Sequence, residues 1–521
     1  MRHLPFRPAV FALALVLAGC AQVPGSGLGF KTGELPPPPP QRQWPDLERD
    51  VRSARAQQLG LIAMPELQAY LNGLLARIKT AAGVPGWPGA VHVTTSSALE
   101  AHSTGAGNIY LSLGWISSAE SEDEIVAILS HEFGHIYLDY HQLESTTVAS
   151  DQVAKLAALG ASLARKAGSA AGWGPVDSII ASYTLGKNVL VPAWNRQQEE
   201  NADRFGATIS MQLGYSYAQG FKAFLERQAT WEMEHAKAED ERRKRMVEQL
   251  KLAAAQEARK QAGGNGVAPL TEMQASLNAG LAGAGADLRN GLDDLWKKVT
   301  VSHPSTEARL TSLTAQVAPL LAGKPRPAPL SAPWEKARAQ RRTAALLKNY
   351  RAANEAQQAM QAQDYALARK LAAQAASGPS ARHALPLMML SMAQAEQSAV
   401  SARAGAVLDK NLQSQEDRAW QLYVLRANAL AGAGQHSPAA AVMDQGFSYF
   451  RDAGPAWPDA IAFYGQTESW DKARKLAQEC ASRFPSYADA CDKAAQSPQE
   501  QAEAKRQGEQ KAKSLVDRLF K

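Results

Sequence analysis

The sequence predicts a mainly α-helical protein with a small β-sheet, in which a compact domain is followed by helical repeats. Only 7% of the 521 residues are aromatic, and alanine dominates the 45% that are hydrophobic; alanine favours helices, whereas aromatic residues favour strands. Two short stretches rich in β-branched and aromatic residues, 91–95 and 108–113, are the best strand candidates. A faint repeat in the last third of the chain indicates stacked helices.

Charge and cysteine content exclude several classes of function. The formal charge of +6 is spread over the whole chain, so no concentrated basic face is expected and nucleic acid is not an expected partner. Three cysteines are too few for a disulfide framework or a cysteine-built metal site.

The N-terminus has the pattern of an export signal. Residues 1–19 combine basic Arg2 and Arg7 with an apolar stretch too short to span a bilayer. The last residues before Cys20 resemble the lipobox of bacterial lipoproteins, which implies a lipidated Cys20 and attachment to the outer membrane from the periplasm. An ordinary signal peptide with an incidental cysteine is the alternative. We expect residues 20–43 to form a Pro-rich tether, in which residues 21–40 extend over at most about 60 Å.

Composition divides the rest of the chain into two parts. A first domain is expected over residues 44–320, and a Pro-rich linker over 321–333. Within the first domain, residues 221–261 read as one long helix with charges of both signs. That helix is either a coiled-coil arm for a partner or, as favoured by base rates, a solvated helix with internal charge pairs.

The second part, residues 334–500, carries the repeat. Residues 365–372 match residues 470–477 in six of eight positions by type. Alanines that mark successive units are spaced by 34, 37 and 34 residues, at Ala368, Ala402, Ala439 and Ala473. This period resembles tetratricopeptide repeats, which form an α-solenoid with a concave peptide-binding face. Residues 501–521 are expected to form a charged C-terminal helix or tail.

One helix carries the clearest chemical motif. Ser121 and Glu124 have the spacing of a capping box and precede an apolar run. The helix continues through His131, Glu132 and His135, a His-Glu-x-x-His pattern. Histidines at i and i+4 share one helical face and can bind one zinc ion, with the adjacent glutamate as a general base.

A catalytic zinc site needs a third protein ligand, which must come from another segment. Glu199 and Asp203 also lie at i and i+4. Glu199 is therefore the expected ligand, and Asp203 the expected acceptor for a ring N–H of a ligating histidine. Glu200 points about 100° away and is the weaker candidate.

These motifs together resemble the gluzincin zinc metallopeptidases that include HtpX, BepA and the CAAX prenyl proteases. The resemblance extends over about residues 46–318 and includes three further stretches: residues 107–114, which resemble an edge strand and turn; residues 122–124; and residues 302–305 with Arg309. It implies a zincin-like domain with one zinc ion. The implied zinc ligands are His131, His135 and Glu199. Glu132 is the implied general base, and Asp203 is the implied hydrogen-bond acceptor for a ligating histidine.

The resemblance also implies a role for His303, whose counterpart in the family lies over the active site. His303 is expected either to occupy the fourth zinc position and block substrate, or to donate to the oxyanion; a structural loop residue is the alternative. The chain departs from the family pattern at Asn201 and at residues 100–102, where other residues are common. These departures concern the substrate edge rather than the metal ligands.

With its lipobox and repeats, the whole chain resembles a BepA-type periplasmic protease. We therefore expect a zinc endopeptidase that hydrolyses unfolded or misassembled envelope proteins, with contacts to the outer-membrane assembly machinery through the repeats. The alternative is a chaperone or assembly adaptor for outer-membrane proteins, in which the protease site is dormant.

The remaining two cysteines fall in the repeat part. Cys480 and Cys491 lie on either side of Pro485. If Pro485 is in the turn of a helical pair, the two thiols face each other and a disulfide is expected in an oxidising compartment. Two buried free thiols are the alternative.

Overall fold

The structure is a computed structural model. It describes residues 30–39, 43–57, 60–139, 194, 196–235, 306–395, 402–414, 417–497, 499–500 and 503. The predicted lipidation site Cys20, the candidate gate His303, and almost all of residues 501–521 lie outside these ranges.

A three-stranded sheet forms the centre of the first domain, and its strands are β1 (Val91–Thr94), β2 (Ala101–Ser103) and β3 (Ile109–Ser112). Their order is β1-β3-β2, with β1 parallel and β2 antiparallel to β3. Both predicted strands are confirmed. The interpretation of residues 107–114 as an edge strand is wrong, because β2 pairs along the second side of β3 and makes it the central strand.

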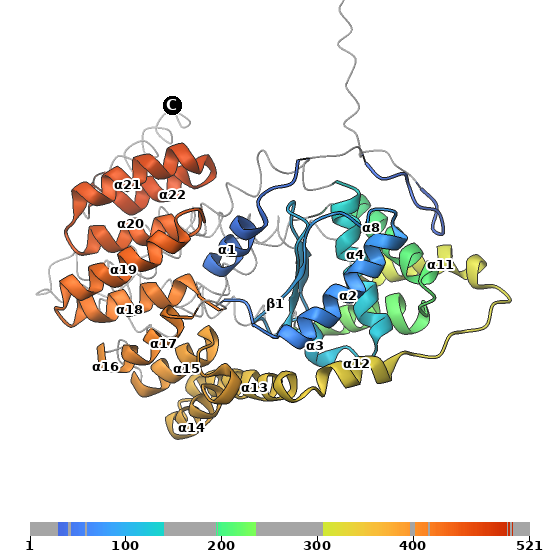
Figure 1. The fold of residues 1–521 in the computed structure, drawn as a ribbon, viewed down its shortest axis with the longest axis horizontal. Helices are drawn as coiled ribbons and strands as arrows, with labels where there is room; N and C mark the ends of the chain where they lie inside the picture. The colour runs from blue at the N-terminus through green and yellow to red at the C-terminus, as the bar shows by residue number, and fades with distance from the viewer. Residues whose placement is uncertain are drawn as a thin grey trace, which may run out of the picture.

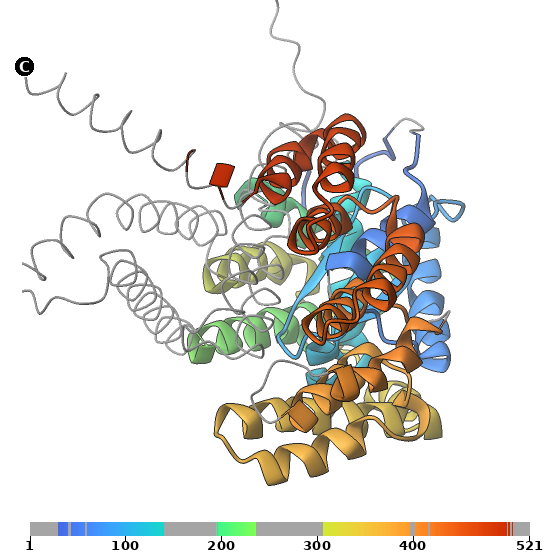
Figure 2. The same cartoon turned by 90° about the vertical axis from the view of Figure 1, so that its left-hand side faces the viewer.

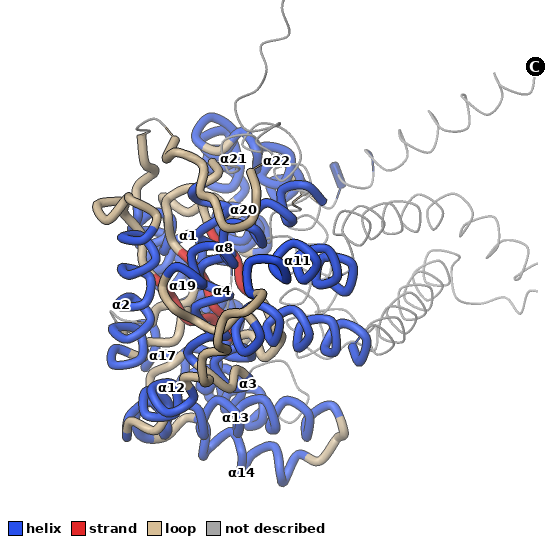
Figure 3. The backbone as a smooth tube through the Cα atoms, turned by 90° about the vertical axis from the view of Figure 1, so that its right-hand side faces the viewer, coloured by secondary structure: helices blue, strands red, loops and turns tan. Residues whose placement is uncertain are grey.

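The helix that carries the His-Glu-x-x-His motif, α4 (Glu122–Tyr137), is buried over its whole length. It contacts β2 and β3 on one side and packs against the other helices of the domain. Figure 3 shows α4 and α8 in front of the strands. The neighbouring helices are α2 (Pro65–Ala81), α3 (Leu113–Ser118), α8 (Arg196–Gln212), the π-turn η1 (Ala218–Lys222) and α11 (Thr306–Leu321). Residues 223–235 continue from η1 as a helix, and the remainder of the predicted helix 221–261 lies outside the described residues.

Residues 30–39 are attached to the first domain by hydrogen bonds. In residues 30–39, Thr32 donates to Gln316 of α11 at 2.9 Å, and the amide of Gly33 donates to Thr208 of α8 at 2.9 Å. Tyr137 of α4 donates to the Pro36 carbonyl at 2.8 Å. The expectation of a tether over residues 20–43 is therefore wrong for residues 30–39, because these bonds attach them to three helices of the domain.

The second part of the chain is a stack of helices that begins with α12 (Ser331–Arg338), and Figures 1 and 2 show the stack beside the first domain. Trp334 of α12 is fully buried and donates to the Ala119 carbonyl at 2.8 Å, so α12 packs on the first domain. The longer helices that follow are α13 (Arg341–Gln361), α14 (Tyr365–Ala375), α15 (Ala384–Ala395), α18 (Trp420–Gly432), α19 (His436–Phe450), α20 (Ala456–Gln466), α21 (Trp470–Arg483) and α22 (Ala488–Ala495). The shorter ones are η2 (Gly378–Ser380), α16 (Ala402–Gly405), η3 (Ala406–Leu408), α17 (Asp409–Leu412) and η4 (Pro485–Tyr487).

Consecutive helices of the stack pack in pairs, most closely α13 with α14, α18 with α19, and α21 with α22. A disulfide joins Cys480 of α21 to Cys491 of α22, and both residues are fully buried. Pro485 lies between them in η4, as the spacing of the cysteines predicts.

Helix α1 (Leu47–Gln57) joins the two parts and lies between them in Figure 1. On the sheet side, Asp50 accepts hydrogen bonds from Thr104, Asn108 and Tyr110 at 2.7–3.0 Å. On the other side α1 contacts α18 and α19. Among the described residues no helix is both long and apolar enough to cross a membrane.

A buried lysine gives a test of this fold. Lys79 is 6% exposed and donates to the carbonyls of Trp87, Pro88 and Gly89 at 2.9–3.0 Å. We expect Lys79→Met to lower the free energy of unfolding by about 3 kcal/mol, because three carbonyls lose their donor. Lys222→Met is the control, since the Lys222 side chain is partly exposed and pairs with exposed Glu226. Equal stability of the two variants in urea titrations would contradict the prediction.

Candidate metal centre

The sequence sets the start of α4 and thereby the phase of the motif. Ser121 is the N-cap, and its hydroxyl accepts from the Glu124 amide at 3.2 Å, as the predicted capping box requires. The Glu124 carboxylate accepts from the Glu120 amide at 3.0 Å rather than from the N-cap amide. Acidic side chains in the first turn also interact favourably with the helix dipole. The helix then runs without interruption through His131 and His135.

Two glycines allow α4 and α8 to approach each other closely. A Cβ on Gly134 of α4 would lie 3.2 Å from the Ala202 Cα of α8. A Cβ on Gly206 of α8 would lie 2.9 Å from the backbone nitrogen of His131 and 2.6 Å from Phe221. Larger side chains at these positions would separate the helices. The close contact is what brings the acidic face of α8 to the histidines.

Three buried side chains meet where α4 and α8 touch. The Nε2 atoms of His131 and His135 lie 3.2 Å apart. Glu199 of α8 places Oε2 at 3.5 Å from His131 Nε2 and Oε1 at 3.8 Å from His135 Nε2. One ligand atom from each residue lies within 4.8 Å of the others. Two imidazole nitrogens and one carboxylate oxygen form a donor set that fits zinc, so this cluster is compatible with a bound metal ion.

Asp203 lies behind the first of these histidines. Its Oδ1 is 2.9 Å from His131 Nδ1, so Nδ1 carries the proton that it donates and Nε2 keeps a lone pair for a metal. Burial opposes a charge on His131, but the hydrogen bond and the charge of Asp203 raise its pKa above the usual value. This contact is the one that the i and i+4 spacing of Glu199 and Asp203 predicts.

Arg309 of α11 connects Glu199 and Asp203, two of the three carboxylates of α8. Its Nε and Nη2 donate to Asp203 at 2.8 and 2.7 Å, and Nη1 lies 2.9 Å from Glu199 Oε2. Burial favours a neutral Asp203, but the charge and hydrogen bonds of Arg309 outweigh this and hold its pKa well below the usual range. The sequence analysis identified Arg309 only as part of a stretch that resembles the family, and gave it no role. The structure shows that it keeps Asp203 ionised and orients both carboxylates.

Glu132 lies beside the cluster and is 6% exposed. Burial, reinforced by the charge of Glu199, raises the pKa of Glu132 to about 7, although His131 and a hydrogen bond with Ser103 act in the opposite direction. A pKa near neutrality suits a group that both accepts and returns a proton.

Two contributors to the site escaped the sequence analysis. Trp194 stacks on the ring of His135 with centroids 4.5 Å apart and an interplanar angle of 11°. Ser103, from edge strand β2, reaches Glu132 as described above. Trp194 is close to Glu199 in sequence, but no pattern indicates the stacking. Ser103 follows residues 100–102, where the chain departs from the family pattern.

The other candidate residues lie elsewhere. Glu200 points away from the histidines and pairs with Arg196 at 2.9 Å and Arg204 at 3.4 Å. His92 and His102 stack on Tyr110, with centroids 5.3 and 5.0 Å from it. The structure thus brings together five of the predicted site residues with Arg309: His131, Glu132, His135, Glu199 and Asp203.

The choice between Glu199 and Glu200 gives a first test of this centre. We expect Glu199→Ala to remove most of the bound zinc, because a buried carboxylate beside both histidines is lost. Glu200→Ala is the matched control and should keep one equivalent, since its carboxylate pairs with arginines. Zinc content after dialysis distinguishes them. Retention of zinc by Glu199→Ala would refute the assignment of the third ligand.

A second test concerns Asp203. Asp203→Asn keeps an acceptor for His131 Nδ1 but loses the charge that Arg309 faces. We expect zinc affinity to fall by about 10- to 100-fold, as is usual for partners of ligating histidines. Competition with a chromophoric chelator measures the affinity. An unchanged dissociation constant would show that the ionised carboxylate has no role in the site.

Comparison with known proteins agrees with this geometry. Residues 65–317 match the family model described as Peptidase family M48, and that range contains every ligand candidate and Arg309. A search of curated proteins finds no significant match. Members of the M48 family are metalloproteases, and the match supports assignment of residues 65–317 to this metallopeptidase family.

Proposed function

We propose that the protein is a zinc-dependent endopeptidase. The observation that carries this proposal is the buried group of His131, His135 and Glu199, with Glu132 on the same helix as the two histidines. The family-model match over residues 65–317 supports the reaction class. A zinc ion bound by these ligands would supply a Lewis acid that activates water and polarises a peptide carbonyl.

In this proposal Glu132 carries the proton. Its carboxylate accepts a proton from the attacking water and then passes it to the leaving amide nitrogen. Burial holds the pKa of Glu132 at about 7, which allows both steps near neutral pH. The hydrogen bond with Ser103 helps to orient the carboxylate.

The groups behind the ligands hold the donors in place. Asp203 keeps the proton of His131 on Nδ1 at a distance of 2.9 Å. Arg309 bonds both Asp203 and Glu199, so these two side chains of α8 cannot rotate independently. These contacts limit the reorganisation that metal binding requires.

The location and substrates of the enzyme are part of the same proposal. We propose a lipoprotein attached through Cys20 to the outer membrane and facing the bacterial periplasm. Its substrates are unfolded or misassembled envelope proteins, and the helix stack after residue 334 consists of tetratricopeptide-like repeats that present them. The spacings of 34, 37 and 34 residues between the repeated alanines, and the paired packing of α13 with α14 and α18 with α19, support the repeat assignment.

The experiment that tests the enzyme proposal uses Glu132→Gln in the full chain. The variant should keep one zinc equivalent and lose at least about 1,000-fold in the rate of casein cleavage, because the proton acceptor is removed while the ligands stay. Chelation should abolish wild-type cleavage, and added zinc should restore it. Glu200→Gln is the control for a charge change near the site.

Absence of cleavage by the wild-type, zinc-loaded protein would contradict the proposal. In that case, binding of unfolded outer-membrane proteins by both wild type and Glu132→Gln would favour an assembly adaptor with a dormant site.

A further inference from the structure

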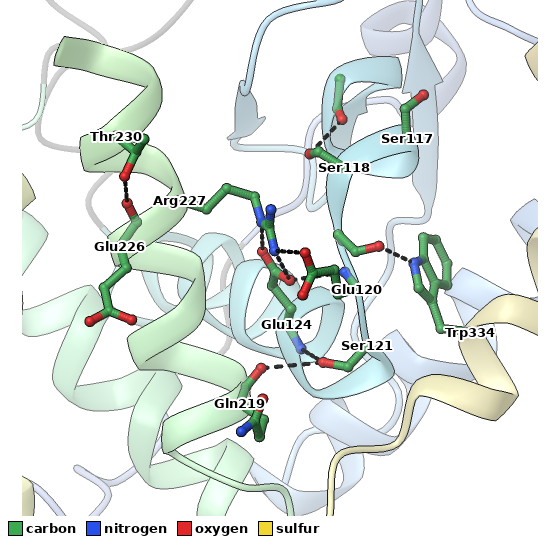
Figure 4. A network of polar contacts seen from close by, with 12 residues as sticks. Ser117, Ser118, Glu120, Ser121, Glu124, Gln219, Glu226, Arg227, Thr230 and Trp334 are labelled. Carbon is green, nitrogen blue, oxygen red and sulfur yellow. Dashed lines mark hydrogen bonds and ion pairs between the residues drawn. The ribbon is translucent and has the colours of Figure 1, made fainter. Parts of the chain in front are cut away.

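The helix of residues 223–235, here called the brace helix, is attached to the start of α4. Its Arg227 donates from Nε to Glu124 Oε1 at 2.6 Å and from Nη2 to Glu124 Oε2 at 3.4 Å. Arg227 Nη2 also lies 3.1 Å from Glu120. Figure 4 shows this guanidinium between the two carboxylates. Because Glu124 is 1% exposed, its charge requires a partner of this kind.

The turn that precedes the brace helix is held at the same place. The hydroxyl of Ser121 donates to the Gln219 carbonyl at 3.2 Å (Figure 4). The Ser216 amide donates to Asp123 Oδ1 at 2.8 Å. Thus the N-terminal turn of α4 fixes both η1 and the brace helix, and the position of that helix is set relative to the motif.

From this anchor the brace helix reaches a metal-ligand candidate. Phe224, one turn before Arg227, lies with its ring centroid 5.9 Å from that of His131. It packs edge-on against Trp115 at 5.4 Å and is 7% exposed. The His131 ring is therefore in contact with Phe224 and bonded to Asp203, which limits its rotation.

The other end of the brace helix contacts α11. Thr306, the first residue of α11, donates to both oxygens of Glu232 at 2.8 and 2.9 Å. The charge of Glu232 also acts on Arg309, one turn further along α11. The brace helix therefore contacts the element that holds Asp203 and Glu199.

We propose that the brace helix positions the metal centre from two sides, with Arg227 and Glu232 as positioning residues. Arg227 fixes the helix so that Phe224 supports His131, and Glu232 fixes α11 and balances the charge of Arg309. This inference rests on the proposed function, since it assumes that His131 and Glu199 bind the metal.

The competing explanation is that Arg227 only neutralises a buried carboxylate. The chain provides a matched control for it. Arg77 of α2 also pairs with a carboxylate of the first turn of α4, Glu122, at 3.3 Å, but none of its described contacts reaches His131 or α11. If neutralisation is the only role, removal of either arginine affects stability and leaves the metal site intact.

The decisive measurement is zinc affinity of the full chain, determined by competition with a chromophoric chelator. Arg227→Met should weaken zinc binding by about 10-fold or more, whereas Arg77→Met should change it less than about 2-fold. Arg227→Lys should recover part of the loss, because an ammonium can still pair with Glu124. Cobalt-substituted Arg227→Met should also show a shifted visible absorption spectrum, which loss of stability alone would not produce.

A milder variant keeps the test informative if Arg227→Met does not fold. Glu232→Gln keeps an acceptor for Thr306 and removes only the charge beside Arg309, so we expect zinc affinity to fall about 3- to 10-fold. Glu226→Gln is its control on the same helix, because Glu226 is exposed and pairs with Lys222.

Zinc constants equal to wild type in Arg227→Met, or in Glu232→Gln where only that variant folds, would overturn the inference. This outcome is distinct from failure of the proposed function, in which the wild-type protein itself would bind no zinc or cleave no casein.

Discussion

The structure depends on the burial of α4, a helix that carries four acidic side chains and two histidines. All of its residues are buried, including Glu122, Asp123 and Glu124 in the first turn and the motif residues further along. A buried charge is costly unless it is paired and hydrogen-bonded. The elements around α4 therefore supply hydrogen-bond and ion-pair partners for its buried polar side chains.

The three carboxylates of the first turn are bound by four segments of the chain. Glu122 accepts from Tyr70 of α2 and from Tyr215, and Asp123 accepts from the amides of Ser216 and Leu330. Glu124 forms an ion pair with Arg227 of the brace helix. One helical turn thus joins α2, the turn before η1, the brace helix and the chain entering α12. The phase of the motif is set by contacts about two turns away from the histidines.

The charged side chains around the histidines carry a net negative charge. Glu199 and Asp203 contribute two negative charges, and Arg309 contributes one positive charge. The net charge of these three groups is −1 (−2 + 1), or −2 when Glu132 is ionised, and a bound divalent cation would offset this buried negative charge. Arg309 alone cannot neutralise the centre. This balance is the physical reason that a metal fits among these residues.

The sequence predicted the parts of the site that depend on helical spacing. His131 and His135, and Glu199 and Asp203, share faces because residues at i and i+4 must do so on a helix, and both pairs are found together. Spacing could not predict contacts between distant segments. The stacking of Trp194 on His135, and the route from Glu232 through Thr306 to α11, depend on tertiary packing.

The same limit applies to the fold. Residue composition predicted strands β1 and β3. Strand β2 contains no β-branched residue, and it forms because its backbone pairs with the edge of β3 that β1 does not occupy. The proline content of residues 30–39 predicted a tether, yet Tyr137, Thr208 and Gln316 supply hydrogen-bond partners that fix this segment to the domain.

Helix α1 helps to determine how the helix stack sits relative to the metal centre. Asp50 attaches α1 to the side of the sheet that carries Tyr110, whereas α4 contacts the strands from the other side. Helix α1 is also hydrogen-bonded to the helix stack, since Gln421 of α18 donates to the Ala56 carbonyl at 2.5 Å. The sheet therefore lies between the stack and the histidines, with β2 as the edge strand nearest Glu132. The position of the stack is therefore set both by α1, on the Tyr110 side of the sheet, and by α12, whose Trp334 donates to the Ala119 carbonyl just before α4.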